Sequence, residues 1–329
     1  MINKGQILKR VTTVLIVLLS IAGLSILIFI GLGSANNLPD KSNLVYDIQE
    51  FKIVSEEYIC YKEQRQITIE AEKLYGIAID SSNTLYLSGD LFLMSFTDKG
   101  ELLSKIQLEE AARCIAVDEE GIVYLGMTDH VEIYNSKTKD WDMWASLGNN
   151  AIITSIAVGK DFVFVADAGN QVIIKYDIQG KLIQFIGRKD AQKESNFIIP
   201  SPYFDIALAQ DRTLWAANSG TRKLINFDLT GKFIKSWGIS SPKIEGFVGC
   251  CNPIHFTLMK DGSFVTSEKG LARVKIYNAV GEFQCVVASP ASFSEHPEGL
   301  DLAINSKAQI YILDQNKKMV RIFSKKEDA

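Results

Sequence analysis

The sequence lacks the short motifs that identify most reaction types. It contains no C-x-x-C pair, no H-E-x-x-H motif, no phosphate-binding glycine loop and no Ser, His and Asp in the order of a known hydrolase. Histidine is scarce, with three in 329 residues, and cysteine occurs five times. The sequence therefore names no specific reaction, and the places of these rare residues become the main guide to a site.

An excess of basic residues is also missing. The chain has 35 Lys and Arg against 39 Asp and Glu, which gives a formal net charge of −4. Nucleic-acid binding depends on clustered basic side chains that displace counterions from phosphates. We therefore expect no nucleic-acid partner, and we expect most charged side chains to form a solvated surface.

A single long apolar run lies near the N-terminus. Lys4, Lys9 and Arg10 precede an uncharged stretch over residues 11–33, which at about 1.5 Å per residue crosses a hydrocarbon layer roughly 30 Å thick. The positive-inside rule keeps residues 1–10 in the cytoplasm and places the remaining chain on the other side. This pattern predicts a single-pass membrane protein whose main domain is periplasmic or extracellular.

A cleaved signal peptide is the alternative interpretation of this run. The segment Gly33-Ser34-Ala35 is a weak small-residue cleavage site, but the apolar core of a signal peptide usually spans only about 7–15 residues. The greater length favours an uncleaved signal-anchor. Residues 34–50 are then a polar linker, and residues 51–329 form the extracytoplasmic domain.

The rest of the chain repeats a pattern of apolar strand, polar turn and apolar strand. Successive copies start 38 to 50 residues apart, as from 76 to 114 and from 155 to 205, which is the size of one four-stranded propeller blade. Apolar runs bounded by Gly, Asp and Asn indicate strands, and no helical stripe competes with them outside the N-terminal run. The sequence therefore predicts an all-β, six-bladed β-propeller, with copies that open at Gly76, Cys114, Ser155, Asp205, His255 and Asp301.

The repeated phrases resemble the NHL repeat. The segment Asp167-Ala168-Gly169-Asn170, followed by Ile174-Lys175-Tyr176-Asp177, is the best match, and Asn218–Arg222 is a fair one. The resemblance covers residues 58–326 and implies a six-bladed propeller. It also implies that the loops leading into the inner strands share one face of the ring, the top face, with the loops between second and third strands.

The strand count predicts how the ring closes. The sixth copy ends after its third strand, at Val320–Phe323, while an unassigned strand precedes the first copy at about residues 58–69. If that N-terminal strand is the outer strand of the last blade, no sheet edge is left unpaired. Cys60 and Cys285 then lie on outer strands of adjacent blades, either as packing residues or as a covalent staple.

The loops of the top face lengthen in the later copies. Those leading into inner strands cover residues 188–204, 238–254 and 288–300, against 108–113 in an early blade. Long loops without secondary structure of their own are often functional. All three histidines fall on this face, as do three of the five cysteines. We therefore expect the functional site on the top face of blades four to six.

The sharpest local motif is Gly246–Pro253 (GFVGCCNP), followed by Thr266–Gly270 (TSEKG) and Arg273-Val274-Lys275 (RVK). With Pro200–Asp205 it resembles a signature of a group of bacterial NHL-propeller proteins, which implies a place for the site but no reaction. The predicted binding residues are Tyr203, Asp205, Cys250, Cys251, Asn252, His255, Glu268, Lys269, Arg273 and Asp301.

Several of these residues also allow a purely structural interpretation. Asp205 and Asp301 could cap loop amides at the channel mouth rather than act on a ligand. Glu268, Lys269 and Arg273 form a charged tip that could be a binding patch or a salt-bridge cluster satisfied within itself. The sequence leaves both interpretations open.

The adjacent cysteines allow three interpretations. Cys250 and Cys251 with His255 could bind zinc, copper or iron, and Cys114 or His296 could complete the ligand set. However, neighbouring cysteines rarely both bind one ion, because one side chain tends to point away. A vicinal disulfide or redox pair is the second interpretation, and a structural role is the third.

Three functions follow from these features. The first is a membrane-anchored binding module that holds a small molecule or a partner protein on the top face of blades four to six. The second is a metal-dependent lyase or hydrolase at the mouth of the central channel, by analogy with other six-bladed propellers. The third is a redox or electron-transfer module that uses Cys250 and Cys251. The sequence does not decide whether the protein is an enzyme.

Overall fold

The computed structural model describes residues 50–187, 196–294 and 298–326. The chain divides into two units, residues 1–47 and 48–329, and all described residues belong to the second. The predicted membrane segment 11–33 and most of the predicted linker 34–50 therefore lie outside the described residues. Within the described ranges, no helix is long and apolar enough to cross a membrane.

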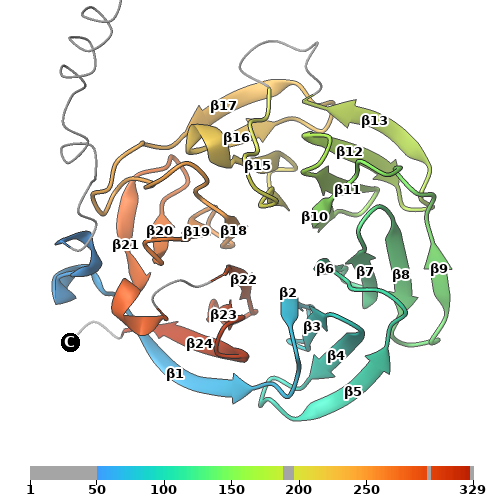
Figure 1. Cartoon of the computed structure of the whole chain (residues 1–329), viewed down its shortest axis with the longest axis horizontal. Coiled ribbons are helices and arrows are strands. Elements are labelled where there is room, and N and C mark those ends of the chain that lie inside the picture. Colours follow the sequence, from blue (N-terminus) through green and yellow to red (C-terminus); the bar gives the residue numbers. More distant parts are fainter. Residues whose placement is uncertain (1–49, 188–195, 295–297, 327–329) are drawn as a thin grey trace, which may run out of the picture. The chain divides into compact units, whose positions relative to one another are not determined.

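The second unit is a ring of six four-stranded antiparallel sheets (Figure 1). Each sheet is one blade, with one strand beside the central channel and the fourth at the rim of the ring. No α-helix occurs among the described residues. The prediction of an all-β six-bladed propeller is confirmed.

The strands follow the sequence repeats. Blade 1 contains β2 (Leu74–Ile79), β3 (Leu85–Gly89), β4 (Phe92–Phe96) and β5 (Leu102–Gln107). Blade 2 contains β6 (Cys114–Val117), β7 (Ile122–Gly126), β8 (Val131–Asn135) and β9 (Trp141–Met143). Blade 3 contains β10 (Ile153–Val158), β11 (Phe162–Asp167), β12 (Val172–Asp177) and β13 (Leu182–Ile186).

The second half of the ring has the same plan. Blade 4 contains β14 (Ile206–Leu208), β15 (Leu214–Asn218), β16 (Lys223–Phe227) and β17 (Phe233–Trp237). Blade 5 contains β18 (His255–Leu258), β19 (Phe264–Ser267), β20 (Val274–Tyr277) and β21 (Phe283–Ala288). Blade 6 contains β22 (Leu300–Ile304), β23 (Ile310–Asp314), β24 (Met319–Lys325) and, from the other end of the chain, β1 (Tyr61–Thr68). Short 3-10 helices are η2 (Glu50–Lys52), η3 (Glu56–Tyr58), η5 (Ser219–Thr221) and η6 (Pro290–Ser292).

The Asp and Asn residues of the repeat shape the hairpin turns. In the turn after β12, Oδ1 of Asp177 accepts hydrogen bonds from the backbone N–H groups of Gln179 and Lys181, at 3.0 and 2.8 Å. Gly180 then adopts a φ of +82°, a left-handed conformation that glycine reaches without steric cost. The same side-chain turn recurs at Asp80, Asp118, Asp228 and Asn278.

The cores lie between neighbouring blades. Blades 1 and 2, for example, share a cluster that includes Tyr86, Leu93, Val123 and Leu125. Burying one such side chain contributes about 1.5–3 kcal/mol, so each blade depends on its two neighbours. The stability of the ring therefore requires that its two ends meet.

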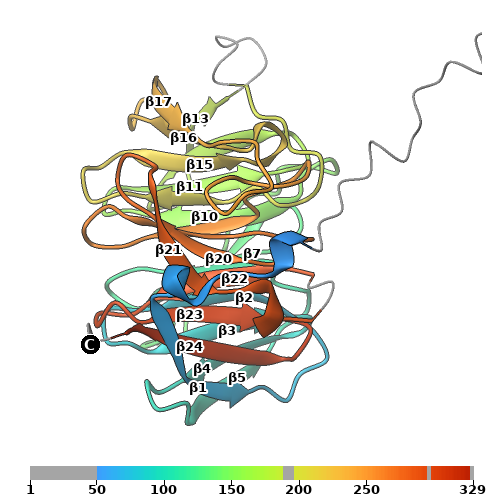
Figure 2. The ribbon, with the colours of Figure 1, turned by 90° about the vertical axis from the view of Figure 1, so that its left-hand side faces the viewer.

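The ring closes through β1, as the strand count predicts. β1 pairs antiparallel with β24, from Tyr61 opposite Lys325 to Thr68 opposite Met319 (Figure 2). The guanidinium of Arg321 on β24 makes a two-point ion pair with Glu63 on β1, at 2.9 and 2.6 Å. The hydrogen bonds from Arg321 lower the pKa of Glu63 despite its partial burial.

A disulfide bond fastens this closure to the next blade. Cys60, just before β1, is bonded to Cys285 in β21, and the two residues are 225 positions apart in sequence. Ile59 also pairs with Val286 in a parallel bridge, and the N–H of Cys60 donates to the carbonyl of Val286 at 3.2 Å. Of the two roles that the sequence allowed for these cysteines, the staple is the one observed.

Candidate functional site

The loop between β17 and β18 is folded back on itself. The N–H of Phe247 donates to the carbonyl of Ile239 at 2.8 Å, and the N–H of Ser241 donates to the carbonyl of Phe247 at 3.2 Å. The side chain of Phe247 is buried and packs against the rings of Trp237 and Tyr277, with centroid distances of 6.0 and 5.5 Å. We call residues 239–254 the blade-5 loop.

A buried group of charges supports this loop from beneath. Glu268 lies in the tip between β19 and β20, and its carboxylate accepts two hydrogen bonds from Arg273, both at 3.0 Å. The ammonium of Lys275 lies 2.8 Å from the same carboxylate. The side chains of all three residues are at most 1% exposed. Among the described residues, these are the only ion pairs with both partners so deeply buried.

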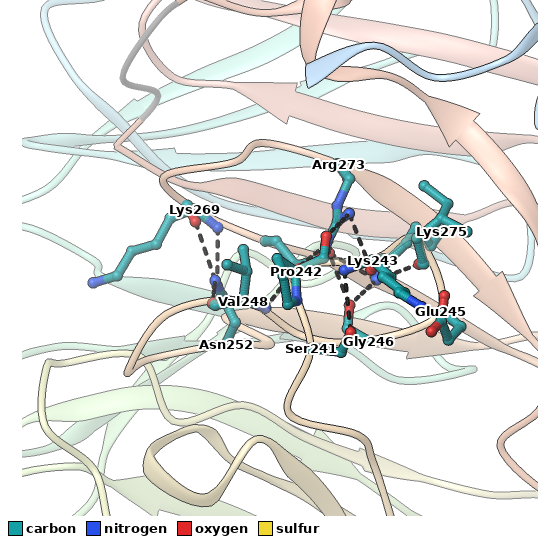
Figure 3. Close-up of polar contacts among 12 residues, drawn as sticks. Ser241, Pro242, Lys243, Glu245, Gly246, Val248, Asn252, Lys269, Arg273 and Lys275 are labelled. Atoms are coloured by element: carbon teal, nitrogen blue, oxygen red, sulfur yellow. Dashed lines mark hydrogen bonds and ion pairs between the residues drawn. The ribbon is translucent and has the colours of Figure 1, made fainter. Parts of the chain in front are cut away.

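Arg273 and Lys275 also satisfy the backbone of the blade-5 loop (Figure 3), and Tyr277 adds one further hydrogen bond. Arg273, Lys275 and the Tyr277 hydroxyl donate hydrogen bonds of 2.6 to 3.3 Å to consecutive carbonyl groups. Burial lowers the pKa of Lys275 to about 8 even though Glu268 opposes that shift. Each carbonyl would otherwise cost about 1–3 kcal/mol if it were buried without a donor. The acceptors are the carbonyl oxygens of Pro242, Lys243, Ile244, Glu245 and Gly246.

Asn252 joins the end of this loop to the charged tip. Its amide nitrogen donates to the carbonyls of Val248 and Lys269, at 2.6 and 3.1 Å, and its amide oxygen accepts from the N–H of Lys269 at 2.9 Å. The buried carboxylate of Glu268 accepts from the N–H of Val248 at 3.1 Å. The loop and the tip are therefore held as one unit.

This unit presents a small polar surface, which we call the loop patch: Ser201, Tyr203, Cys250, Cys251 and Lys269. The two cysteine sulfur atoms are 3.2 Å apart, with Cys250 exposed and Cys251 buried. The ammonium of Lys269 donates to the Ser201 hydroxyl at 3.1 Å and lies 4.4 Å from the centre of the Tyr203 ring. The Tyr203 hydroxyl donates to the carbonyl of Glu298 in the neighbouring loop.

The surroundings in the loop patch shift the pKa values of the two thiols in opposite directions. Burial raises the pKa of Cys251, but hydrogen bonds from Ser201 and Cys250 and the charge of Lys269 outweigh it, so the net shift is downward. The hydrogen bond to Cys251 and the charge of its sulfur raise the pKa of Cys250. A thiolate on Cys251 is therefore stabilised beside an exposed, protonated Cys250.

The channel mouth carries a second cluster. Nδ1 of His255 lies 3.6 Å from a carboxylate oxygen of Asp205 and 3.4 Å from one of Asp301. The edge of its ring faces Tyr203, with a centroid distance of 5.8 Å. His255 therefore connects the loop patch to the channel mouth.

The carboxylates of this cluster accept hydrogen bonds from the protein itself. Asp205 accepts from the N–H groups of Ile206 and Phe256 and from the Ser155 hydroxyl, at 2.6 to 3.0 Å. Asp301 accepts from the N–H groups of Leu302 and Ile77, at 2.8 and 3.0 Å. Since these bonds cross from blade 4 to blades 3 and 5, and from blade 6 to blade 1, they fasten the inner strands together. The capping role is thus observed for both aspartates.

Burial and mutual charge shift the pKa values in this cluster. Desolvation, reinforced by Asp205 and only partly offset by His255, raises the pKa of Asp301 to about 6. Burial disfavours the charged form of His255, but the two carboxylates outweigh that effect and raise its pKa. Cys114 nearby is buried, and burial raises the pKa of its thiol.

These shifts predict how stability depends on pH. Asp301 has a higher pKa in the folded chain than the ordinary 3.8, so its stabilising contribution is complete below pH 4 and is lost as the pH rises through about 6. The raised pKa of His255 adds a loss of the same sign at higher pH. We expect wild type to lose up to about 2 kcal/mol relative to Asp301→Asn between pH 4.5 and 7.5. Urea denaturation at both pH values measures this change, and parallel pH curves for the two proteins would show that Asp301 is not shifted.

The structure brings most of the predicted residues together. Tyr203, Cys250, Cys251 and Lys269 lie in the loop patch, and Asn252 anchors it. Asp205, His255 and Asp301 form the channel-mouth cluster. Glu268 and Arg273 belong to the buried group, so they act beneath the surface and not at an exposed tip.

The predicted metal ligands do not form one set in the part of the chain that the structure describes. No group of three or more His, Cys, Asp and Glu side chains there could hold a metal ion. Cys114 packs beside Gly126 and among the apolar residues of blades 2 and 3. His296, which could have completed the ligand set, lies outside the described residues.

Lys275 and Tyr277 carried a signal that the sequence interpretation did not use. Arg273, Lys275 and Tyr277 alternate along β20 and its preceding residue, so their side chains point to the same face of the sheet. That spacing aims both cations at one partner. Ser201 lies inside the motif 200–205, but nothing local indicates its contact with Lys269 from the next blade.

The comparisons with known proteins support the fold. No family model matches the chain, and no curated protein matches it. Among solved structures, the chain is similar to one titled "Streptogramin B lyase structure", with a TM-score of 0.60 and 12% sequence identity over 83% of this chain and 100% of that one. At this identity the likeness establishes a shared six-bladed propeller and nothing about activity. The resemblance to NHL repeats at the level of family stays a prediction.

Proposed function

We propose that this propeller is a binding module and that the loop patch is its contact surface. The observation that carries the proposal is the buried group of Glu268, Arg273 and Lys275 beneath the blade-5 loop. Buried ion pairs are costly to desolvate and add little net stability. Ring closure does not need one here, because β20, which carries Lys275, is already paired with β19 on one side and with β21 on the other. A rigid, preorganised loop instead lowers the entropy lost on binding.

The charges around the loop patch favour an anionic partner. Arg222, Lys243 and Lys269 have no carboxylate within 4.0 Å among the residues described here, although the chain as a whole is acidic. Arg222 donates to the carbonyl of Gly249 at 3.3 Å, which places it next to Cys250. Unpaired cations on a rigid surface attract carboxylates and give orientation to the complex. We infer that the partner is an acidic segment of another protein.

The tip beside the patch leaves room for such a segment. Gly249 and Gly270 are exposed and both have φ values of +79°. No heavy atom lies within 4 Å of the position where a Cβ of Gly270 would stand. An extended acidic chain can therefore approach the backbone closely between the two glycines.

The binding proposal makes a direct prediction for Lys269. A fluorescent hexaglutamate peptide should bind the protein, and Lys269→Gln should weaken that binding about tenfold, because a charge-assisted hydrogen bond is worth about 1.5–3 kcal/mol. Fluorescence anisotropy at low and moderate salt measures the affinity, which should fall as salt screens the patch. The matched control is Lys260→Gln, an exposed lysine in the turn between β18 and β19. Equal binding by wild type and Lys269→Gln would remove the patch from the proposal.

The N-terminal run supports a membrane-anchored, extracytoplasmic location for this module. The proposal rests on the uncharged residues 11–33 and on the basic residues before them. We expect the full chain to stay in the membrane pellet after alkaline extraction and to be digested by protease added from outside. Recovery of the chain in the soluble fraction, or protection from the protease in intact spheroplasts, would contradict this location.

A further inference from the structure

The Cys250–Cys251 pair differs from the other cysteines of the chain. Cys60 and Cys285 are joined in the closing disulfide, and Cys114 is buried among apolar side chains. Cys250 is exposed to solvent, and its sulfur lies 3.2 Å from the sulfur of Cys251. The Cys250 sulfur is accessible to a small molecule or a peptide, and the buried Cys251 sulfur lies close enough to form a bond with it.

The surroundings of Cys251 favour a negative sulfur. Lys269 is a cation without a carboxylate partner in the described ranges, and its ammonium contacts Ser201. The Cys250 sulfur lies 3.2 Å from the Cys251 sulfur, and the influence of Ser201, Cys250 and the charge of Lys269 lowers the pKa of Cys251 despite its burial. Nearby cations and hydrogen-bond donors activate cysteine in this way in thiol–disulfide enzymes.

We propose that Cys250 and Cys251 are a thiol–disulfide exchange site that forms a reversible vicinal disulfide with the disulfides of small thiols or exposed peptides. The proposal does not depend on whether the loop patch binds an acidic segment. It assigns Cys250 as the sulfur that meets the substrate and Cys251 as the sulfur that resolves the intermediate.

The exchange has two steps. In the first, Cys250 loses its proton to solvent, and its thiolate attacks one sulfur of a substrate disulfide. A Cys250–substrate disulfide forms, the substrate S–S bond breaks, and the other half leaves as a thiolate that takes up a proton. In the second, the Cys251 thiolate attacks the Cys250 sulfur, forms the vicinal disulfide and releases the second half, which is also protonated. The two cysteines lose two electrons and two protons, and the substrate disulfide gains them.

Covalent geometry makes the product easy to reduce again. Adjacent Cα atoms across a trans peptide are about 3.8 Å apart, whereas most disulfides join Cα atoms about 4.4–6.8 Å apart. Strained and exposed disulfides have higher reduction potentials and are the labile ones. The pair should therefore cycle between dithiol and disulfide, unlike Cys60–Cys285, which is stabilised by the ring it closes.

Glutathione disulfide tests the proposal on the full chain in detergent. After mild reduction that leaves Cys60–Cys285 intact, the protein is treated with glutathione buffers of different redox ratio, quenched with acid and alkylated unfolded. We expect the free thiols to fall from three to one, and mass spectrometry of the peptide to show a Cys250–Cys251 link without bound glutathione. A stable glutathione adduct on wild-type Cys250, or three free thiols at every ratio, would overturn the proposal.

Two variants separate the assigned roles. Cys251→Ser should accumulate a glutathione adduct on Cys250, because nothing can resolve it, whereas Cys250→Ser should react slowly if at all. Lys269→Gln should slow resolution severalfold near neutral pH and shift the pH–rate profile upward, since the charge of Lys269 helps to lower the pKa of Cys251. An unchanged profile in Lys269→Gln, or an adduct on Cys251 in place of Cys250, would contradict the assignment. Cys114→Ala serves as the control and should exchange as wild type does.

Discussion

Replacing Glu268 with glutamine is expected to lower the free energy of unfolding by about 3–5 kcal/mol. The substitution keeps the shape of the side chain but leaves Arg273 and Lys275 buried without an anion. Urea denaturation followed by tryptophan fluorescence measures the loss. Trypsin should also cut after Lys243 much faster than in wild type, because the blade-5 loop would no longer be held down.

An exposed ion pair provides the matched control for this prediction. Asp98 and Lys307 are both more than 40% exposed and lie 4.0 Å apart. Asp98→Asn should therefore change the free energy of unfolding by no more than about 1 kcal/mol. If Glu268→Gln costs as little as Asp98→Asn and leaves the tryptic cleavage unchanged, the buried group does not hold the loop.

Removing the Cys60–Cys285 disulfide is expected to cost about 2–5 kcal/mol. The double variant Cys60→Ser with Cys285→Ser loses a cross-link between residues 225 positions apart, and long closed loops give the largest stabilisation in the chain-entropy account. The pairing of β1 with β24 and the Glu63–Arg321 ion pair remain, so the ring should still close. Thermal and urea unfolding, with and without a reducing agent, measure the effect.

The free thiols give the comparison for the disulfide. Cys250→Ser, an exposed change, should alter the unfolding free energy by less than about 0.5 kcal/mol, and reducing agent should destabilise it as much as wild type. The double variant should be insensitive to reducing agent. A double variant as stable as wild type would mean that β1 alone closes the ring.

Much of the fold could be predicted from short-range patterns in the sequence. The alternating apolar runs gave the strands, and residues such as Asp177 and Gly180 marked the turns because they satisfy backbone groups within a few positions. The closure through β1 followed from counting, since one strand was missing at one end and surplus at the other. These features depend on short-range chemistry or on topology, and both are visible in a repeat.

The site was harder to predict because its contacts join distant loops. Glu268 and Arg273 lie at a strand tip, where charged residues are usually solvated, and they become buried only because residues 242–246 fold over them. The contact of Lys269 with Ser201 bridges 68 positions. The sequence placed Asp205 and Asp301 at the channel mouth, but their blade-to-blade bonds depend on the exact approach of neighbouring strands.

Photo-crosslinking in cells tests most directly whether the loop patch is the contact surface. A photoreactive amino acid is placed at Cys250, in the blade-5 loop, and in a second protein at Lys260, in the turn at the other end of the same blade; both positions are exposed. We expect a defined crosslinked protein with an acidic segment from position 250, none from position 260, and loss of the product when Lys269→Gln is added. Equal crosslinking from position 260, or a product at position 250 that is unaffected by Lys269→Gln, would contradict it.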